Sequence, residues 1–577
     1  MTARGVSKIG TLVLGSLLII FSQGVKGQNG LAGRITDKNT TEPLVGVSIY
    51  IHDLRQGAVT DTAGRYHLVN LPTGRFLVEV SYLGYASAVQ AVTLNGEQTL
   101  DFTLSASPTE LNGVTVTGVS AATEVRRSPI PMQIIGRTVL QQAVATNLID
   151  ALARQPGISQ VSTGPAISKP VIRGLSYNRV ITLYNGVRHE GQQWGDEHGL
   201  EVDEYAVDRV EIIKGPGSLL YGSDGIAGVI NLLAPTPEPE GHISGQMLAN
   251  YQTNNGLIGY SAMTTGTRKG INWLARVSGK KAGNYQNAYD GRVYNSGFRE
   301  LDMNGYVGIN RKWGYSQVHF SSFDQHTAIT EGERDSTGRF TQPIVESDGS
   351  FGSQPVSEHA LSGYGLGIPN QRIRHQRLLL INNIYVGASR LAFNGGYQLS
   401  QRQEFGEVTN PTRYGLYFYL PTLTYDLKYF FPEHNGWKTT IGASGMSQQN
   451  KNKGSKFLIP DYQLFDAGGF VFTQKAFERF DISGGLRYDQ RQITTQDLLL
   501  ANDQRVPAGT PGAVTKFTGF TAYYGNYSGS VGASYQVSPH LLVKGNVARG
   551  YRAPNMAEIG SNGRHEGTFR YEIGTRL

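Results

Sequence analysis

Apolar and polar residues alternate along most of the chain from about residue 243 onward. The segments Leu301–Ile309, Ile271–Val277 and Phe477–Tyr488 place apolar side chains at every second position, with polar side chains between them. Successive side chains of a strand point to opposite faces, so these segments predict strands with one apolar and one polar face. We count roughly fourteen such strands, although the signal in each strand is weak.

A soluble β-sandwich also alternates in this way, so the connections between the strands decide the class. Strands of about ten residues, rich in Tyr, Phe and Trp and joined by short turns and long polar loops, favour a transmembrane antiparallel β-barrel. The segments Phe323–Arg372 and Gln496–Phe517 are long, polar and rich in Gly, Ser and Pro, and we expect them to be extracellular loops. The barrel is predicted to occupy residues 238–577.

The N-terminal part of the chain predicts smaller units. Short alternating runs between residues 28 and 105 are separated at about ten-residue spacing by turn sequences such as Asp61–Gly64 and Pro72–Gly74, which is typical of a small β-sandwich. Residues 106–120 are a linker. Residues 121–237 combine a helical pattern at Val139–Ala153 with Gly-rich strand-turn pieces, and this pattern predicts an α/β domain.

The first 27 residues have the pattern of a signal peptide. Arg4 and Lys8 precede a short apolar run, Thr11–Phe21, and Val25–Gly27 is a candidate cleavage site. The apolar run is shorter than the roughly 20 residues that a transmembrane helix needs. We therefore expect an exported protein without a helical membrane anchor.

Composition excludes several classes of protein. The chain has 73 Gly and 31 Tyr, only 17% charged residues and a net charge of +7 without any long Lys/Arg run, so nucleic-acid binding is not expected. It contains no Cys, which excludes disulfides and thiolate metal sites. We find no triad order, zinc-hydrolase motif or nucleotide loop, so we predict no catalytic residue, no required cofactor and no enzyme.

An ordered set of motifs lies between residues 170 and 231. Pro170–Gly174, Leu183–Val187, Val210–Gly222 and Gly228–Asn231 follow one another, and together they resemble the plug domain of TonB-dependent receptors. We expect the glycines to form tight turns that let the plug fit inside a barrel. Arg173 and Glu211 are expected to pair with charges of the barrel wall or with each other. The plug-motif residues are Arg173, Gly174, Glu211, Gly215, Pro216, Tyr221, Gly222 and Asn231.

Two further segments carry family resemblances. Gly57–Tyr66, followed by Gly84 and Tyr85, resembles the carboxypeptidase regulatory-like domain, without any zinc-peptidase residues. Gly550–Glu558 and His565–Gly574 resemble a mid-barrel motif of TonB-dependent receptors. Barrels of that family usually have about 22 strands, so the resemblance implies that the C-terminal part of the barrel is missing from this sequence.

The linker before the plug has the sequence Glu110–Gly118, which looks like a TonB box. Such a segment must be extended, β-prone and able to add as a strand to the edge of a partner's sheet. Val114, Thr115, Val116 and Thr117 meet this need and are the predicted TonB-binding residues. The alternative is an ordinary edge strand or linker.

The segment Arg188–Gly199 is rich in groups that bind metals. Its two imidazoles and three carboxylates are an N/O ligand set that suits zinc, copper or iron. It is similar to the plug loop of outer-membrane zinc receptors, where an Asp-His pair binds metal. The alternative is a solvated loop that forms salt bridges to the barrel wall. The candidate ligands are His189, Glu190, Asp196, Glu197 and His198, and His326, His359 and His375 are possible additions.

The resemblance implies a Gram-negative outer-membrane receptor that actively imports a scarce nutrient. Its partners would be the TonB-ExbB-ExbD energy complex, outer-membrane lipid and an extracellular metal, chelate or other small ligand. An iron chelate such as a siderophore or haem is an alternative ligand, because a chelate pocket favours aromatic residues such as Trp194, Tyr184 and Tyr205. An alternative hypothesis is a glycan or peptide receptor, which would have a surface lipoprotein as a further partner. Another alternative is a passive porin-like channel, but such a channel would have no plug.

Overall fold

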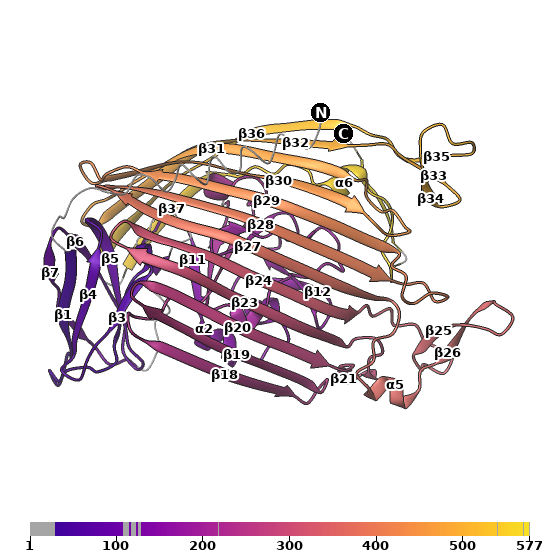
Figure 1. Cartoon of the computed structure of the whole chain (residues 1–577), viewed down its shortest axis with the longest axis horizontal. Coiled ribbons are helices and arrows are strands. Elements are labelled where there is room, and N and C mark those ends of the chain that lie inside the picture. The colour runs from indigo at the N-terminus through magenta and orange to yellow at the C-terminus, as the bar shows by residue number, and fades with distance from the viewer. Residues whose placement is uncertain are drawn as a thin grey trace.

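The computed structural model describes residues 29–107, 115–116, 123–124, 128–216, 218–538, 541–568 and 570–575, with the side chains of residues 115, 116, 123, 124 and 218 left out. The predicted signal peptide lies outside the described residues. Three units follow one another along the chain: a two-sheet sandwich, an α/β plug and a large antiparallel sheet that curves around the plug (Figure 1).

The N-terminal unit is the predicted sandwich. Its core consists of inward apolar side chains of both sheets, among them Leu31, Ile49 and Val78, which are fully buried. One sheet has the order β4-β1-β7 with β8 also paired to β1, and the other has the order β3-β2-β5-β6. The elements are β1 (Asn29–Asp37), β2 (Ser48–Ile51), the 3-10 turn η1 (His52–Leu54), β3 (Gln56–Val59), β4 (Arg65–Leu71), β5 (Gly74–Ser81), β6 (Ala88–Leu94), β7 (Glu97–Thr99) and β8 (Phe102–Leu104).

The plug is built on a five-stranded sheet with the order β11-β16-β17-β14-β15. Strands β14 and β17 are parallel and wholly or almost wholly buried, as expected for strands covered on both faces. Its elements are β11 (Met132–Gly136), α2 (Arg137–Gln142), α3 (Leu148–Leu152), β12 (Ile158–Gly164), β13 (Ile167–Ile172), β14 (Val180–Tyr184), β15 (Val187–Arg188), η2 (Glu204–Ala206), β16 (Arg209–Lys214), α4 (Ser218–Tyr221) and β17 (Gly228–Leu233).

The single helix predicted for Val139–Ala153 is two short helices, so that prediction is wrong in detail. Val144, between the two helices, has a φ of 45°. This left-handed conformation is incompatible with a continuing α-helix and is rare for a β-branched residue. The Asn147 side chain then accepts a hydrogen bond from the Asp150 backbone N–H and begins α3. The apolar spacing matches the buried side chains of α3, but Val144 is exposed and α2 has no buried side chain, and the spacing contained no signal for this break.

The third unit is a 13-stranded antiparallel sheet in which each strand pairs with the next along the chain, apart from the loop strands. Its strands are β18 (Ile243–Gln252), β19 (Leu257–Arg268), β20 (Ile271–Ala282), β23 (Phe298–Arg311), β24 (Gly314–Ala328), β27 (Asn370–Val386), β28 (Ser389–Phe405), β29 (Leu416–Phe430), β30 (Trp437–Asn452), β31 (Tyr462–Ala476), β32 (Phe480–Thr495), β36 (Thr521–Ser538) and β37 (Leu541–Arg549).

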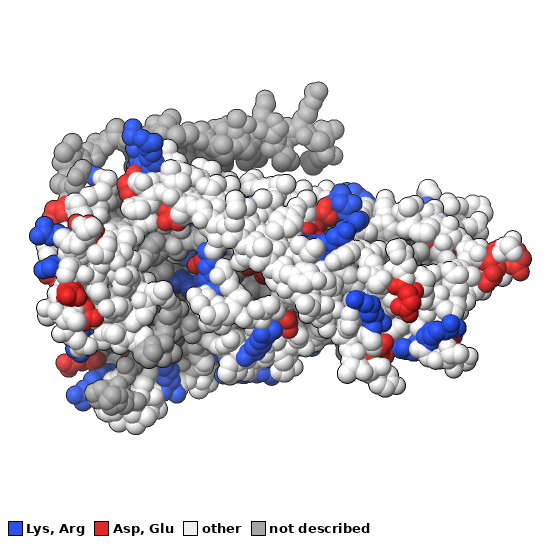
Figure 2. All heavy atoms as spheres, turned by 90° about the horizontal axis from the view of Figure 1, so that it is seen from below, with Lys and Arg blue, Asp and Glu red and all other residues white. Residues whose placement is uncertain are grey.

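Burial along these strands is the reverse of that in a soluble protein. On β23 the apolar side chains of Met303 and Val307 are 51% and 61% exposed, whereas the polar side chains of Asp302 and Asn304 are buried. Apolar residues outside and polar residues inside are the signature of a sheet whose outer face meets lipid. Figure 2 agrees, because charged side chains gather at the two ends and the middle of the molecule is mostly uncharged.

The two ends of the sheet differ. Two-residue turns, such as Lys312–Trp313 between β23 and β24, occur at the end where the sandwich sits, which we call the sandwich end (Figure 1). The long connections lie at the opposite end, the loop end. They contain β21 (Gln286–Asn287), β22 (Gly291–Arg292), β25 (Thr341–Val345), β26 (Phe351–Pro355), α5 (Glu358–Ser362), β33 (Leu498–Ala501), β34 (Gln504–Val506) and β35 (Val514–Phe517).

The chain continues beyond β37 with α6 (Met556–Gly560), β38 (Asn562–Arg564) and β39 (Tyr571–Ile573). The linker before the plug contains β9 (Thr115–Val116), which pairs with β10 (Thr123–Glu124) in a ladder of two residues. Within the described part of the chain, no helix has the length and apolar character needed to cross a membrane.

Candidate metal site between plug and barrel

The predicted ligand loop does not form one site. It starts at β15, and its two histidines lie in different clusters on the inner face of the barrel wall. His189 lies with Glu201 and His375, and His198 lies with Glu404 and His565. All of these residues are buried. The contacts around each cluster show which of them can accept a cation.

His198, Glu404 and His565 come from three separate parts of the chain. His198 is on the plug loop, Glu404 is at the loop end of β28, and His565 follows β38. Glu404 Oε1 lies 3.3 Å from His198 Nε2 and 3.4 Å from His565 Nδ1. One ligand atom from each of the three side chains falls within 4.8 Å of the others. We call this group the His-Glu-His site.

The surroundings of His198 fix its tautomer. Its Nδ1 is 2.6 Å from the Gln192 backbone carbonyl oxygen, which can only accept a hydrogen bond, so Nδ1 must carry a proton. In neutral His198, Nε2 therefore has a free lone pair, which faces the Glu404 carboxylate. Metal-binding histidines typically donate their other N–H to a backbone carbonyl in this way. Two electron-rich atoms that face each other call for a cation or a proton between them.

The spacing fits a metal ion. Ligand atoms about 2.0–2.1 Å from a tetrahedral zinc ion are about 3.3–3.4 Å apart, close to the two separations measured around Glu404. A charge-assisted N–H···O bond is shorter, about 2.7–2.9 Å. Burial lowers the pKa of His198 well below its usual range, which keeps its imidazole neutral at physiological pH. The site thus offers the two-His, one-carboxylate set of many zinc centres.

An aromatic and backbone frame holds this site. The Trp194 ring packs against both imidazoles, with centroid distances of 4.8 Å to His198 and 5.2 Å to His565. A methyl group on Gly195 would come within 3.0 Å of both rings, so only glycine fits there without displacing a ligand. The buried ammonium of Lys169 donates a hydrogen bond to the Gly195 carbonyl oxygen.

Protein partners already occupy most of the polar atoms of the second cluster. Arg377 donates to His189 Nδ1 at 3.2 Å, so His189 Nε2 must carry the proton and has no lone pair for a metal. His375 uses both nitrogens, Nδ1 toward Glu201 at 2.5 Å and Nε2 toward Gln398 at 3.2 Å. Arg402 binds the other Glu201 oxygen at 2.7 Å. This cluster is a hydrogen-bonded contact between plug and wall.

A third group of buried carboxylates, formed by Asp203, Glu300 and Asp302, lies against β20. The Lys280 ammonium already contacts it, 3.2 Å from Glu300 and 2.9 Å from Glu204. A protein cation therefore occupies the position that a metal ion would take there. Of the three clusters in the described part of the chain, the His-Glu-His site alone combines imidazole lone pairs with a carboxylate free of Lys or Arg contacts.

The remaining candidate ligands have other partners. Glu190 pairs with Arg188, and Asp196 pairs with Arg570 at 2.6 Å and accepts from the Tyr177 hydroxyl. Burial raises the pKa of Glu197, and its Oε2 has no hydrogen-bond partner among the described residues. His326 bonds to Asn370, and His359 is exposed on α5. Glu404 and His565 were not among the predicted ligands, because no local pattern connects them to the plug loop.

The plug motifs lie where tight turns are required. Gly174, Gly215 and Gly222 have φ values of 83°, 113° and 87°, which other residues rarely adopt. Asn231 donates to Glu211, which also pairs with Arg209 at 3.0 Å, whereas Arg173 is exposed. Pro216 lies two residues before α4, and Tyr221 is the last residue of that helix.

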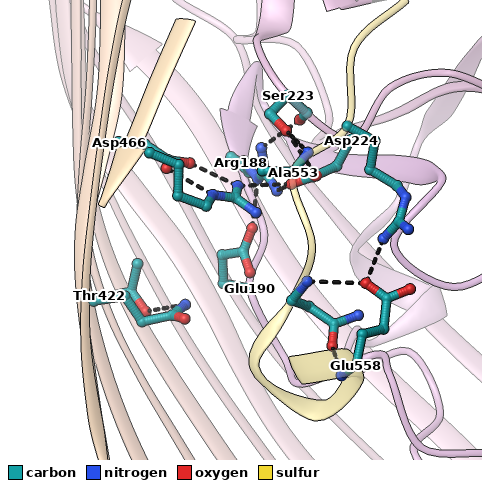
Figure 3. Close-up of polar contacts among 12 residues, drawn as sticks. Arg188, Glu190, Ser223, Asp224, Thr422, Asp466, Ala553 and Glu558 are labelled. Carbon is teal, nitrogen blue, oxygen red and sulfur yellow. Dashed lines mark hydrogen bonds and ion pairs between the residues drawn. The ribbon is translucent and has the colours of Figure 1, made fainter. Parts of the chain in front are cut away.

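An ion-pair network ties the plug to the wall (Figure 3). Asp224 Oδ2 accepts from plug Arg188 at 2.6 Å and from Arg491 of β32 at 2.9 Å. Arg491 also pairs with Asp466 of β31 at 2.7 Å. Burial opposes the charge on Asp224, but the two guanidinium groups outweigh it and lower its pKa to about 2. We call this group the plug lock.

Comparison with known proteins identifies the family. The TonB-dependent receptor-like β-barrel matches residues 242–576, the TonB-dependent receptor plug domain matches residues 124–229, and the CarboxypepD_reg-like domain matches residues 31–116. The chain belongs to the TonB-dependent receptor family. It is therefore an outer-membrane protein of the Gram-negative type, and the resemblances to the receptor plug and barrel and to the carboxypeptidase regulatory-like domain are confirmed.

Individual relatives extend this result. The vitamin B12 transporter of Vibrio vulnificus is 40% identical over 107 residues, a match that spans 18% of each chain. The ferric-catecholate import receptor Fiu of E. coli has the same fold at 15% identity, with a TM-score of 0.57 over 77% of this chain and 74% of that chain. The copper transporter OprC aligns with a TM-score of 0.56 at 14% identity, over 74% and 64% of the two chains.

Proposed function

We propose that this receptor binds a divalent transition-metal ion at the His-Glu-His site and imports it across the outer membrane with energy from the TonB-ExbB-ExbD complex. The observation that carries the proposal is the His198 tautomer, which directs an unprotonated nitrogen at the Glu404 carboxylate. Imidazole and carboxylate ligands suit zinc, copper or iron(II). The loop end would face the exterior and the sandwich end the periplasm.

The burial of the site favours a bare ion over a chelate. The side chains of His198, Glu404 and His565 are 0% exposed, so a siderophore or haem could not contact them, whereas their ligand atoms are close enough together to contact a single ion. Glu572 lies 3.8 Å from His565 Nε2 and is partly exposed, as is Asp196 on the ligand loop. Arg570 contacts both carboxylates, so this partly exposed edge of the site is an ion-pair cluster.

Import also needs a point on which the energy complex can pull. The predicted TonB box supplies β9, whose two residues pair with β10 in a short ladder, the one pairing of β9 within the described part of the chain. Val114 and Thr117 lie outside that part. A ladder of two residues is easily exchanged for a strand of a partner's sheet. In this mechanism TonB binds the segment, pulls the plug, breaks the plug lock and opens a path along the wall.

Uptake of radioactive zinc by cells that carry the full receptor tests the proposal. Val116→Pro removes a backbone donor from the TonB-binding strand, whereas Val116→Thr keeps a β-branched residue at the same position. We expect Val116→Pro and collapse of the proton gradient to abolish uptake while zinc still binds at the cell surface, and Val116→Thr to behave as wild type. Uptake that survives both treatments would contradict TonB dependence.

A further inference from the structure

The sandwich does more than precede the plug, because one of its turns contacts the inner rim of the barrel. The amide of Asn310, near the end of β23, donates to the backbone carbonyls of Leu54 and Arg55 at 3.0 Å each. Asp53 forms an ion pair with Arg390 of β28 at 2.8 Å. These hydrogen bonds and this ion pair, at partly buried positions, make the contact between sandwich and barrel specific. We call Asp53–Arg55 and these partners the rim contact.

Neighbouring residues extend the rim contact around the mouth. The Arg55 guanidinium lies 5.3 Å from the centre of the Tyr315 ring and also hydrogen-bonds to Gln317. The Phe76 ring of the sandwich packs edge-on against Tyr385 of β27 at 5.6 Å. The contact therefore spans strands β23, β24, β27 and β28 at the sandwich end.

A chamber lies between the rim contact and the plug. It has a volume of about 300 Å³ and is lined by sandwich residues such as Asp53, plug residues such as Asn185 and Tyr221, and barrel residues such as Arg390 and Asn394. All three units thus line it. The sandwich forms one wall of the space that a solute leaving the plug on this side would enter.

Strand β28 connects the metal site with this chamber. Strand β28 pairs with β27 and β29 without a break in register, so its side chains alternate between the two faces along its whole length. Every second residue from Glu404 to Arg390 therefore faces inward. With a rise of about 3.4 Å per residue, the two ends of this row are about 48 Å apart. A metal ion that followed the inner face of β28 from Glu404 would reach the Asp53–Arg390 ion pair at its end.

We propose that the sandwich is a detachable cover of the periplasmic mouth, and that its surface at Asp53–Arg55 is a docking surface for the chain's own barrel rim. The predicted TonB-binding segment lies between the last described residue of the sandwich, Ser107, and the first of the plug, Ser128. A pull on that segment loads both of its flanking domains. The sandwich must leave the rim before cargo can leave the chamber.

A cleavable cross-link tests this cover, in an experiment that rests on the proposed zinc import. The chain has no native Cys, so Asp53→Cys and Arg390→Cys together create the only reactive pair, which a short disulfide-containing bis-maleimide can join. We expect the cross-linked receptor to bind zinc with unchanged affinity and to lose at least 90% of its uptake. Reductive cleavage of the linker should restore uptake.

The single variants Asp53→Cys and Arg390→Cys, treated with the same reagent, are the matched controls and should import zinc throughout. If the cross-linked receptor takes up zinc as fast as these controls, the sandwich is not a cover. If the wild-type receptor binds zinc but imports none, the proposed import fails instead.

A second readout of the cover is independent of zinc. In the Arg390→Cys variant, the introduced thiol lies at the rim contact, where the docked sandwich shields it from reagents in solution. Adding Asn310→Ala to this variant removes the hydrogen bonds to the Leu54 and Arg55 carbonyls, and should therefore weaken docking and make the thiol react faster with a membrane-impermeant maleimide. An unchanged reaction rate would contradict detachment.

Discussion

Lys169 shows at the residue scale how the plug supports the ligand His198. Its ammonium is almost fully buried, over the Tyr177 ring at 4.5 Å, and binds the carbonyl of Gly195. The same carbonyl accepts the backbone N–H of His198 at 3.2 Å. Burial lowers the pKa of Lys169 to about 7. Lys169 thus fixes the turn that places His198 without touching the metal position.

Replacement of Lys169 with Met should loosen this turn and weaken zinc binding. Loss of an outer partner of a metal ligand typically costs about 10–100-fold in affinity, and we expect a change of that size. The same substitution at Lys451, an exposed lysine on β30, is the control. Isothermal titration with zinc measures both variants. An unchanged dissociation constant for Lys169→Met would show that the turn holds without this contact.

Zinc binding should release a proton from His565. Burial opposes a charge on this imidazole, but the Glu404 carboxylate outweighs burial and raises its pKa. The free imidazole therefore keeps its proton to a higher pH than an ordinary histidine, and a metal must displace that proton. Zinc affinity should fall about tenfold per unit as the pH drops below that raised pKa. Titrations in buffers of different ionisation enthalpy count the released protons, and a count of zero would contradict this assignment.

At the residue scale, the sequence marks the loop as a candidate for metal binding but does not show how its residues are grouped in space. His189 and His198 are nine positions apart, and the composition of their loop makes both of them candidate ligands. Only the fold places His198 beside Glu404 and His565, which are 206 and 367 positions away in the chain. The proton on His189 Nε2, which excludes it as a ligand, depends on Arg377 from another strand.

At the scale of elements, the plug lock should control how firmly plug and barrel wall are joined. Asp224→Asn leaves Arg188 and Arg491 without their shared carboxylate, and breaking a buried ion pair typically costs about 3–5 kcal/mol. We expect a lower urea midpoint for release of the plug, measured by tryptophan fluorescence, to which Trp194 of the plug contributes. Asp290→Asn, which removes a loop ion pair with Arg334, is the control and should cost less than about 1 kcal/mol.

The same carboxylate gives the plug lock a defined pH dependence. The pKa of Asp224 is about 2 in the folded protein, below its ordinary value of 3.8. Its contribution to stability is therefore complete above about pH 4 and is lost as the pH falls from there toward 2. Wild type and Asp224→Asn should differ in urea midpoint at pH 7 and converge near pH 2. A difference that persists at pH 2 would show that the charge of Asp224 does not hold the plug.

Strand elements were predictable from alternation because each has a lipid face and a lumen face. Ile271–Val277 lies within β20 and Leu301–Ile309 within β23, although the observed strands extend further at their loop ends. The extensions contain polar residues on both faces, so alternation alone could not show them. The break at Val144 was unpredictable for the opposite reason, since its residues keep the apolar spacing of one helix.

At the scale of the whole molecule, the order sandwich, linker, plug and barrel was visible in the motifs, and the family comparison confirms these three kinds of domain. Their arrangement in space was not visible. The contact of Asp53 with Arg390 joins residues 337 positions apart and rests on a single ion pair, which leaves no pattern in the sequence. The proposed cover of the mouth could therefore come only from the structure.

The most direct test of the account is isothermal titration of the full receptor with zinc. The wild type should bind a single zinc ion, and His198→Ala and Glu404→Gln should each abolish that binding. His189→Ala, from the same loop, and Glu407→Gln, three residues beyond Glu404, should leave it intact. Binding that survives loss of His198 and Glu404, or that disappears with His189, would contradict the assignment of the metal to the His-Glu-His site.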